Sequence, residues 1–272
     1  MFAVPSFFGY QRAGFGPNVD PDAQAFFDRV TAAGGTLSVT EQTATNQLVL
    51  DMKAAGIWTP MKAIYPMVGA SAAACAQNLK SSSFTGTFSS GWTFASTGVT
   101  PNGTSAYMDT QLVPSTSLAA NNIHLSYYSR TQSGSAQNST IGSDSGAEYC
   151  RLIIRRRFDI GFNLIGSTTK GLSQFTVTDS KGFFLANAPN STTRDFYKNG
   201  SAVTPTSQAG FGTNGATTTA IYLGCYNSNG TATEFDDKEC AISTIGDGLT
   251  STQASNFYTA VQAFQTTLSR NV

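Results

Sequence analysis

The chain has 272 residues, with 16 basic and 16 acidic side chains, so its formal net charge is zero. Proteins that bind nucleic acid usually carry a basic surplus, and the balance therefore argues against that class. Charged residues make up only 12% of the chain, about half of the usual share. A polar but weakly charged composition favours a sheet-rich extracellular or particle-surface protein.

Membrane insertion and export by a leader peptide are not expected. The sequence contains no run of about 18 apolar residues that could cross a bilayer as a helix. The apolar start lacks a basic region and is interrupted by Pro5 and Gly9, which is unlike a signal peptide.

Residues 1–19 form the first segment, which we predict to be an extended docking arm. Its prolines and glycines oppose a regular helix or strand, and an apolar segment of this kind gains order by lying on another surface. The aromatic residues expected to dock on a partner protein are Phe2, Phe7, Phe8, Tyr10 and Phe15.

Residues 20–82 are predicted to form a small helical module. Asp20 followed by Pro21 is typical of a helix start, and Ser38 with Glu41 has the spacing of a capping box. Residues 57–69 are apolar but contain two prolines, which predicts a buried extended connection. A short Ala-rich helix is expected at 71–77.

Residues 83–272 are predicted to form an antiparallel β-sandwich of the jelly-roll type that ends in a helix. Short alternating runs are separated by Gly, Asn and Ser, and Asn199-Gly200 is typical of a two-residue hairpin turn. Thr250 and Gln253 have capping-box spacing before a stretch of helical apolar periodicity. The expected strands lie at 87–94, 122–128, 148–158, 182–187, 193–198 and 220–226.

The order of these segments resembles a family of bacteriophage virion structural proteins over residues 20–270. The most specific part is the pair of runs at 53–58 (KAAGIW) and 63–69 (AIYPMVG). In that family the module precedes a sandwich similar to laminin-G and concanavalin-like lectin domains. The resemblance implies a virion component but does not indicate head, tail or fibre.

The acidic run at residues 234–239 resembles part of a glycosidase active site. Glu234, Asp236 and Glu239 resemble the acid triad of laminarinase-type glycosidases, which need two carboxyl groups on one strand face. Strand alternation places Glu234, Asp236 and Lys238 on one face and Glu239 on the other. We therefore expect structural or solvated acids and no catalytic residues.

The remaining candidate residues have ordinary structural explanations. His124, the single histidine, alternates with apolar neighbours and is expected at a surface or rim. Cys75, Cys150, Cys225 and Cys240 lie in no metal-binding spacing and are expected to be buried thiols. No cofactor or metal is expected.

Two groups of residues could recognise a glycan. Arginines at 151, 155, 156 and 157 could bind an acidic glycan or phosphate, although a solvated strand, or ion pairs with Asp144, Glu148 or Asp159, explains them better. A stacking platform for sugar rings could consist of Trp92, Phe94, Tyr107, Tyr127 and Tyr128, but aromatic residues in sandwiches mostly belong to the core.

Three hypotheses of function remain. The first is a non-enzymatic virion protein, assembled in the host cytoplasm, that forms homo-oligomers and contacts other virion proteins. The alternative is a glycan-binding adhesin that attaches to a host-surface glycan. The third is a glycoside hydrolase.

Overall fold

The computed structural model describes residues 19–133, 138–156, 159–167, 172–208 and 216–272. The predicted docking arm, with Phe2, Phe7, Phe8, Tyr10 and Phe15, therefore lies outside the described residues. Among the helices described, none is long and apolar enough to cross a membrane.

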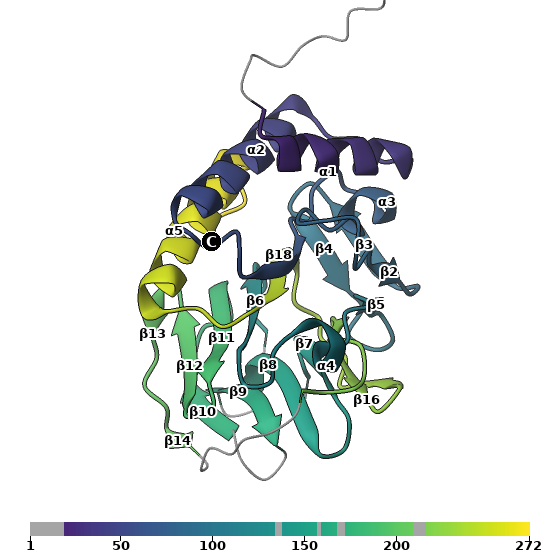
Figure 1. The fold of residues 1–272 in the computed structure, drawn as a ribbon. Coiled ribbons are helices and arrows are strands. Elements are labelled where there is room, and N and C mark those ends of the chain that lie inside the picture. Colours follow the sequence, from purple (N-terminus) through teal and green to yellow (C-terminus); the bar gives the residue numbers. More distant parts are fainter. Residues whose placement is uncertain (1–18, 134–137, 157–158, 168–171, 209–215) are drawn as a thin grey trace, which may run out of the picture.

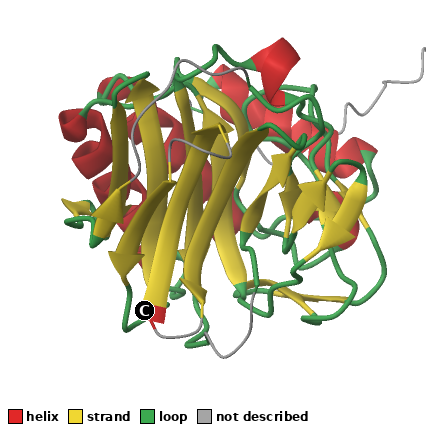
Figure 2. Ribbon diagram, turned by 90° about the horizontal axis from the view of Figure 1, so that it is seen from below, coloured by secondary structure: helices red, strands yellow, loops and turns green. Residues whose placement is uncertain are grey.

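The described part is a sandwich of two mainly antiparallel sheets, with helices along one side (Figures 1 and 2). The strand order of the first sheet is β13-β12-β11-β6-β18-β4-β3, and β1 also pairs with β18. Its strands are β1 (Met61–Tyr65), β3 (Trp92–Ala95), β4 (Gly98–Pro101), β6 (Ile123–Ser129), β11 (Gly182–Asn190), β12 (Thr193–Lys198), β13 (Ser201–Ala202) and β18 (Cys240–Gly246).

The second sheet has the order β14-β10-β9-β8-β7-β15-β5-β2, with β16 pairing in parallel with β7 and antiparallel with β17. Its strands are β2 (Thr87–Phe88), β5 (Met108–Asp109), β7 (Ile141–Asp144), β8 (Glu148–Arg156), β9 (Ile160–Ser167), β10 (Leu172–Thr176), β14 (Ser207–Gln208), β15 (Tyr222–Leu223), β16 (Tyr226–Ser228) and β17 (Thr231–Thr233). The predicted mainly-β sandwich is confirmed.

Three of the five helices described begin at the residues that the capping patterns indicate. They are α1 (Pro21–Ala32), α2 (Val39–Ala54), α3 (Ala72–Cys75), α4 (Pro114–Ser117) and α5 (Ser251–Thr267). Ser38 and Thr250 each form a complete capping box, with Glu41 and Gln253 respectively. Because a capping box satisfies otherwise unpaired backbone groups of the first turn, these short polar motifs fix where the helices start.

The extended segment after α2 becomes a strand of the first sheet. β1 pairs with β18 through Ala63, Ile64 and Tyr65, and all three side chains are fully buried. Trp58, Met67 and Val68 are also buried. The predicted burial is confirmed. The division of the chain at residue 82 stays a prediction, although the helical residues and the first sheet share one core.

Both faces of the first sheet are covered. One hydrophobic cluster joins α1, α2 and α5 to Tyr128, Phe183, Leu185 and Ile242, and the other joins Tyr127, Phe184 and Ile245 to the second sheet. Among the described residues, the helical cluster contains none from the second sheet. The outer face of the second sheet is therefore not covered by α1, α2 or α5.

Candidate functional site

The outer face of the second sheet carries a row of directly paired residues across six strands. The inner row consists of Met108, Leu223, Ile141, Leu152, Asn163 and Ser173, all of which are buried. Since successive side chains alternate between the faces of a strand, the adjacent paired row points outward. It contains Asp109, Tyr222, Gly142, Arg151, Leu164 and Leu172.

Two tyrosine rings stack on this face. The ring centroids of Tyr107 and Tyr222 lie 4.7 Å apart with an interplanar angle of 20°, and both side chains are half-buried. Partial burial, followed by the charge of Asp109, raises the pKa of Tyr222. The Tyr222 hydroxyl therefore stays neutral at physiological pH, and the two rings present a partly accessible aromatic surface.

Arg151 connects this surface to the rest of the face. Its guanidinium carbon lies 3.5 Å from the ring centroid of Tyr226 and 5.7 Å from that of Tyr149. A Cβ atom at Gly142 would lie 2.6 Å from Cγ of Arg151, so the glycine leaves space for the arginine chain. Stacking of this kind holds a guanidinium in one orientation.

Glu234 binds two of the arginines of β8. Its carboxylate accepts hydrogen bonds from Arg151 at 2.5 Å and from Arg156 at 3.2 Å. Arg155 instead pairs with Asp159 at 2.5 Å. The expected pair with Asp159 is confirmed, whereas Glu234 is a partner 83 residues away from Arg151 that strand alternation does not reveal. Arg157 lies outside the described residues.

The three acids of the glycosidase-like pattern have different ion-pair partners. Glu234 pairs with Arg151 and Arg156, Glu239 pairs with Arg130 at 2.9 Å, and Asp236 is fully buried against Lys238. The structure buries Asp236 and Lys238 together, but residues 234–239 are not in a strand and Glu234 is not buried with them, so the predicted strand face of Glu234, Asp236 and Lys238 is wrong. Each glutamate therefore engages a different set of arginines.

Three sequence predictions about single residues have clear outcomes. The surface position predicted for His124 is wrong, because α5 covers the face opposite Ile123 and Leu125, and the ring is fully buried beside Phe257. Burial lowers the pKa of His124 to about 4. The four cysteines are buried and unpaired, as expected.

The proposed five-residue aromatic platform is only partly formed. Tyr127 and Tyr128 are fully buried in the two cores. Trp92 and Phe94 pack with Phe88, with centroid distances of 5.2 Å for Trp92–Phe88 and 5.0 Å for Phe94–Phe88. Tyr107 is the member that joins the outer face. Sequence alternation alone could not place Tyr222, Tyr226 and Tyr149 on the same face, because that requires the pairing of distant strands.

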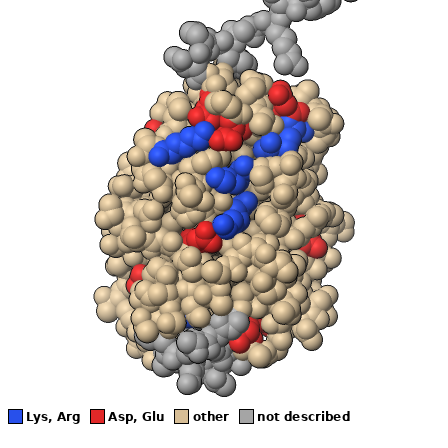
Figure 3. Space-filling model, viewed as in Figure 1, with Lys and Arg blue, Asp and Glu red and all other residues tan. Residues whose placement is uncertain are grey.

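Charged side chains are unevenly distributed over the face drawn in Figure 3, and the described residues offer no metal-binding cluster. Figure 3 shows charged side chains gathered toward the helical end in that view, with mostly uncharged residues elsewhere. Among the residues that the structure describes, no three His, Cys, Asp or Glu side chains gather as a metal site would require.

Comparisons with known proteins concern the fold. No family model and no curated protein matches the chain. Domain 4 of AbnA, a GH43 extracellular arabinanase from Geobacillus stearothermophilus solved with arabinotriose, is 11% identical, with a TM-score of 0.48 over 73% of this chain and 98% of that domain. Trypanosoma rangeli sialidase with sialic acid is 9% identical, with a TM-score of 0.49 over 74% of this chain and 33% of the sialidase.

A third solved structure overlaps less of the chain. The CBM40 of Ruminococcus gnavus IT-sialidase, bound to α2,3-sialyllactose, is 12% identical, with a TM-score of 0.35 over 47% of this chain and 76% of that domain. At these identities the likeness describes a β-sandwich, and no residue role is transferred.

Proposed function

We propose that the protein is a non-catalytic glycan-binding sandwich that attaches a phage particle to its host. The observation that carries the proposal is the outer row of the second sheet. It combines the stacked Tyr107–Tyr222 pair with Arg151 held on Tyr226, on a sheet face that α1, α2 and α5 do not cover.

This combination suits a sugar ring. The apolar C–H face of a pyranose packs on an aromatic ring, while hydroxyls around the ring need fixed hydrogen-bonding groups. Tyr107 and Tyr222 offer the first, and the second comes from the hydroxyls of these tyrosines and the Asp109 carboxylate near Tyr222. Side chains on paired strands are held rigidly, which reduces the entropy lost on binding.

The charges favour a neutral glycan. Arg151 is only 7% exposed and its charge is engaged by Glu234, which also holds Arg156. An acidic sugar would have to displace Glu234 from a nearly buried arginine, and an unpaired buried charge is costly. We therefore expect neutral hexose chains to bind better than sialylated or sulfated ones.

The same ion pairs support a binding protein over a hydrolase. A retaining glycosidase needs a nucleophile and an acid/base about 5 Å apart, with one raised pKa. Here Glu234 pairs with Arg151 and Arg156 of β8, and Glu239 pairs with Arg130, which follows the end of β6. These ion pairs support structural roles for both glutamates.

Binding to a panel of neutral and acidic oligosaccharides, followed by calorimetry on the best ligand, tests the proposal. Tyr222→Ala should weaken binding by at least about tenfold, since a lost ring contact of about 1.4 kcal/mol has that effect. Tyr222→Phe is the matched control and should retain most of the affinity. Wild-type affinity in Tyr222→Ala, or binding restricted to acidic glycans, would contradict the proposal.

Assembly into the particle is a second candidate function, supported by the aromatic residues of 1–19 and by the family resemblance of 20–270. Deleting residues 2–16 is expected to leave the sandwich folded and to abolish incorporation into particles. Normal incorporation of the shortened protein would show that Phe2, Phe7, Phe8, Tyr10 and Phe15 do not dock the chain.

A further inference from the structure

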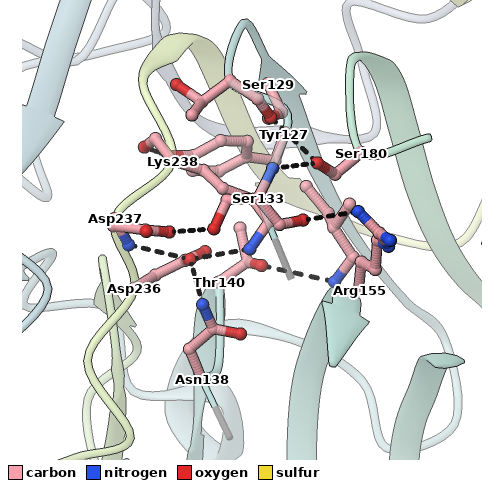
Figure 4. Close-up of polar contacts among 12 residues, drawn as sticks. Tyr127, Ser129, Ser133, Asn138, Thr140, Arg155, Ser180, Asp236, Asp237 and Lys238 are labelled. Carbon is pink, nitrogen blue, oxygen red and sulfur yellow. Dashed lines mark hydrogen bonds and ion pairs between the residues drawn. The ribbon is translucent and has the colours of Figure 1, made fainter. Parts of the chain in front are cut away.

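A lysine, an aspartate and an asparagine meet inside the sandwich, next to the segment that carries Glu234 (Figure 4). Lys238 and Asp236 are fully buried and Asn138 is 3% exposed. The Lys238 ammonium and the Asn138 side-chain amide each donate a hydrogen bond to the same Asp236 oxygen, Oδ1, both at 2.8 Å. The two nitrogens are therefore separated by no more than twice that distance.

Two oxygens of this group lack hydrogen-bond donors. Asp236 Oδ2 and Asn138 Oδ1 are both buried, and neither has a partner among the described residues. Buried side-chain oxygens nearly always have one, so two orphans on adjacent groups require an explanation. A proton on Asp236 Oδ2 would make that oxygen a donor, so the orphaned oxygens favour an aspartate that takes up a proton.

We propose that Lys238 and Asn138 become joined by an isopeptide bond, with Asp236 as the proton carrier. The Lys238 ammonium gives a proton to the Asp236 carboxylate, and the free amine attacks Cγ of Asn138. The new Nζ–Cγ bond forms as the Cγ–Nδ2 bond breaks. The second Nζ proton passes to Nδ2, which leaves as ammonia, and one hydrogen stays on Nζ as the new amide N–H. The ammonia then takes up the proton held by Asp236, so that ammonium is released and Asp236 is again a carboxylate.

The surroundings favour this condensation over hydrolysis. A shared acceptor holds the nucleophile and the amide side by side, which removes most of the entropic cost of bringing them together. Burial keeps water from competing for the amide carbon. The atoms balance without any oxidant, reductant or activating co-reactant, so the folded chain alone suffices.

The bond would fasten the edge of the tyrosine-bearing face. Next to Asn138, the Ser139 backbone N–H donates to the Glu234 carbonyl at 2.7 Å, and Arg151 Nε donates to the Ser139 hydroxyl at 3.4 Å. Asp236 N–H donates to the Gly224 carbonyl at 2.7 Å. A covalent link here closes a loop of about 100 residues, the kind of constraint that resists unfolding most strongly. This inference does not depend on glycan binding.

Denaturing mass spectrometry of the purified full-length chain tests the proposal. The wild type should be lighter than its sequence mass by about 17 Da, the mass of one ammonia. A tryptic digest should contain residues 131–151 joined to 199–270, with no cleavage after Lys238. Asn138→Ala and Lys238→Arg should each restore the sequence mass, and Lys238→Arg keeps the positive charge beside Asp236.

Asn138→Asp keeps the side-chain shape but changes the leaving group from ammonia to water. The mass of this variant should therefore be about 18 Da below the mass calculated from its own sequence. Asp236→Asn should prevent the loss. Because the decisive measurement uses the wild type, poor folding of a variant leaves the test intact. A wild-type mass equal to the sequence mass, with separate peptides 199–238 and 239–270, would overturn the proposal.

Discussion

Protonation of His124 should destabilise the fold in a defined pH window. In the folded protein Nδ1 donates to the Asp247 carbonyl at 2.6 Å and Nε2 lies 3.1 Å from the Thr244 hydroxyl, in a fully buried site. Desolvation lowers the pKa of the ring to about 4, against 6.5 for an exposed histidine. The unfolded chain therefore binds a proton at a pH where the folded chain does not.

The sign and size of the effect follow from this difference. Stability from the neutral ring is fully present above about pH 6.5 and is lost as the pH falls toward 4. A tenfold change in proton affinity corresponds to about 1.4 kcal/mol, so the loss reaches about 2 kcal/mol at pH 5 and about 3 kcal/mol at pH 4.

Urea unfolding of the wild type and His124→Gln between pH 7.5 and 4.5 measures this effect. His124 is the single histidine, so the variant titrates only through groups that both proteins share. The difference in unfolding free energy between the two should shrink by about 2 kcal/mol from pH 7.5 to 5. A difference that stays constant, or a ring that titrates near pH 6.5 by NMR in the folded wild type, would refute the reasoning.

Three further predictions concern stability and catalysis. Arg270 is 1% exposed and donates to the carbonyls of Met67, Pro66 and Ala241. Arg270→Met should therefore lower the free energy of unfolding in urea by at least about 3 kcal/mol. Arg155→Ala, which breaks a half-buried ion pair, should lower it by no more than about 1 kcal/mol. Gly200→Ala should destabilise more than Gly230→Ala, because both have positive φ but only the Cβ at Gly200 would meet the Tyr258 ring, at 2.9 Å; equal losses would contradict this contact. Wild type and Glu234→Gln should both lack activity on β-glucans, agarose-type galactans and host capsule, and cleavage that disappears in the variant would restore the hydrolase hypothesis.

Local motifs predicted the starts of α1, α2 and α5 and the hairpin turn at Asn199-Gly200. Capping boxes at Ser38 and Thr250, and the start at Asp20-Pro21, depend on residues within one turn of each other. At the Asn199-Gly200 turn both residues have positive φ, as the hairpin requires. These signals are strong because the atoms that satisfy each other are close in the chain.

His124 shows where the same reasoning fails. Alternation correctly separates it from Ile123 and Leu125, but a polar residue opposite apolar ones indicates a solvated face only when the sheet has one covered side. All seven residues of β6 are buried, because α5 covers the second face. The sequence of a single strand does not reveal this helical layer.

The candidate glycan-binding face was only partly predictable for a related reason. Tyr107 stood among the expected platform residues, but Tyr222 and Arg151 join it only through pairing across β5, β15, β7 and β8. Glu234 likewise finds Arg151 across a long loop. Non-local register decides these contacts, and one sequence contains no direct signal of it.

The most direct test of glycan binding is to map the bound sugar by NMR on a tyrosine-labelled protein. Titration with the best neutral oligosaccharide should shift the ring signals of Tyr107, Tyr222 and Tyr226 and leave that of Tyr258 on α5 unchanged. Loss of these shifts in Tyr222→Ala, in a protein that still unfolds cooperatively, is the result expected. Shifts confined to Tyr258 and other residues of the helical side, or saturation without any change at Tyr107 and Tyr222, would contradict the proposed glycan-binding face.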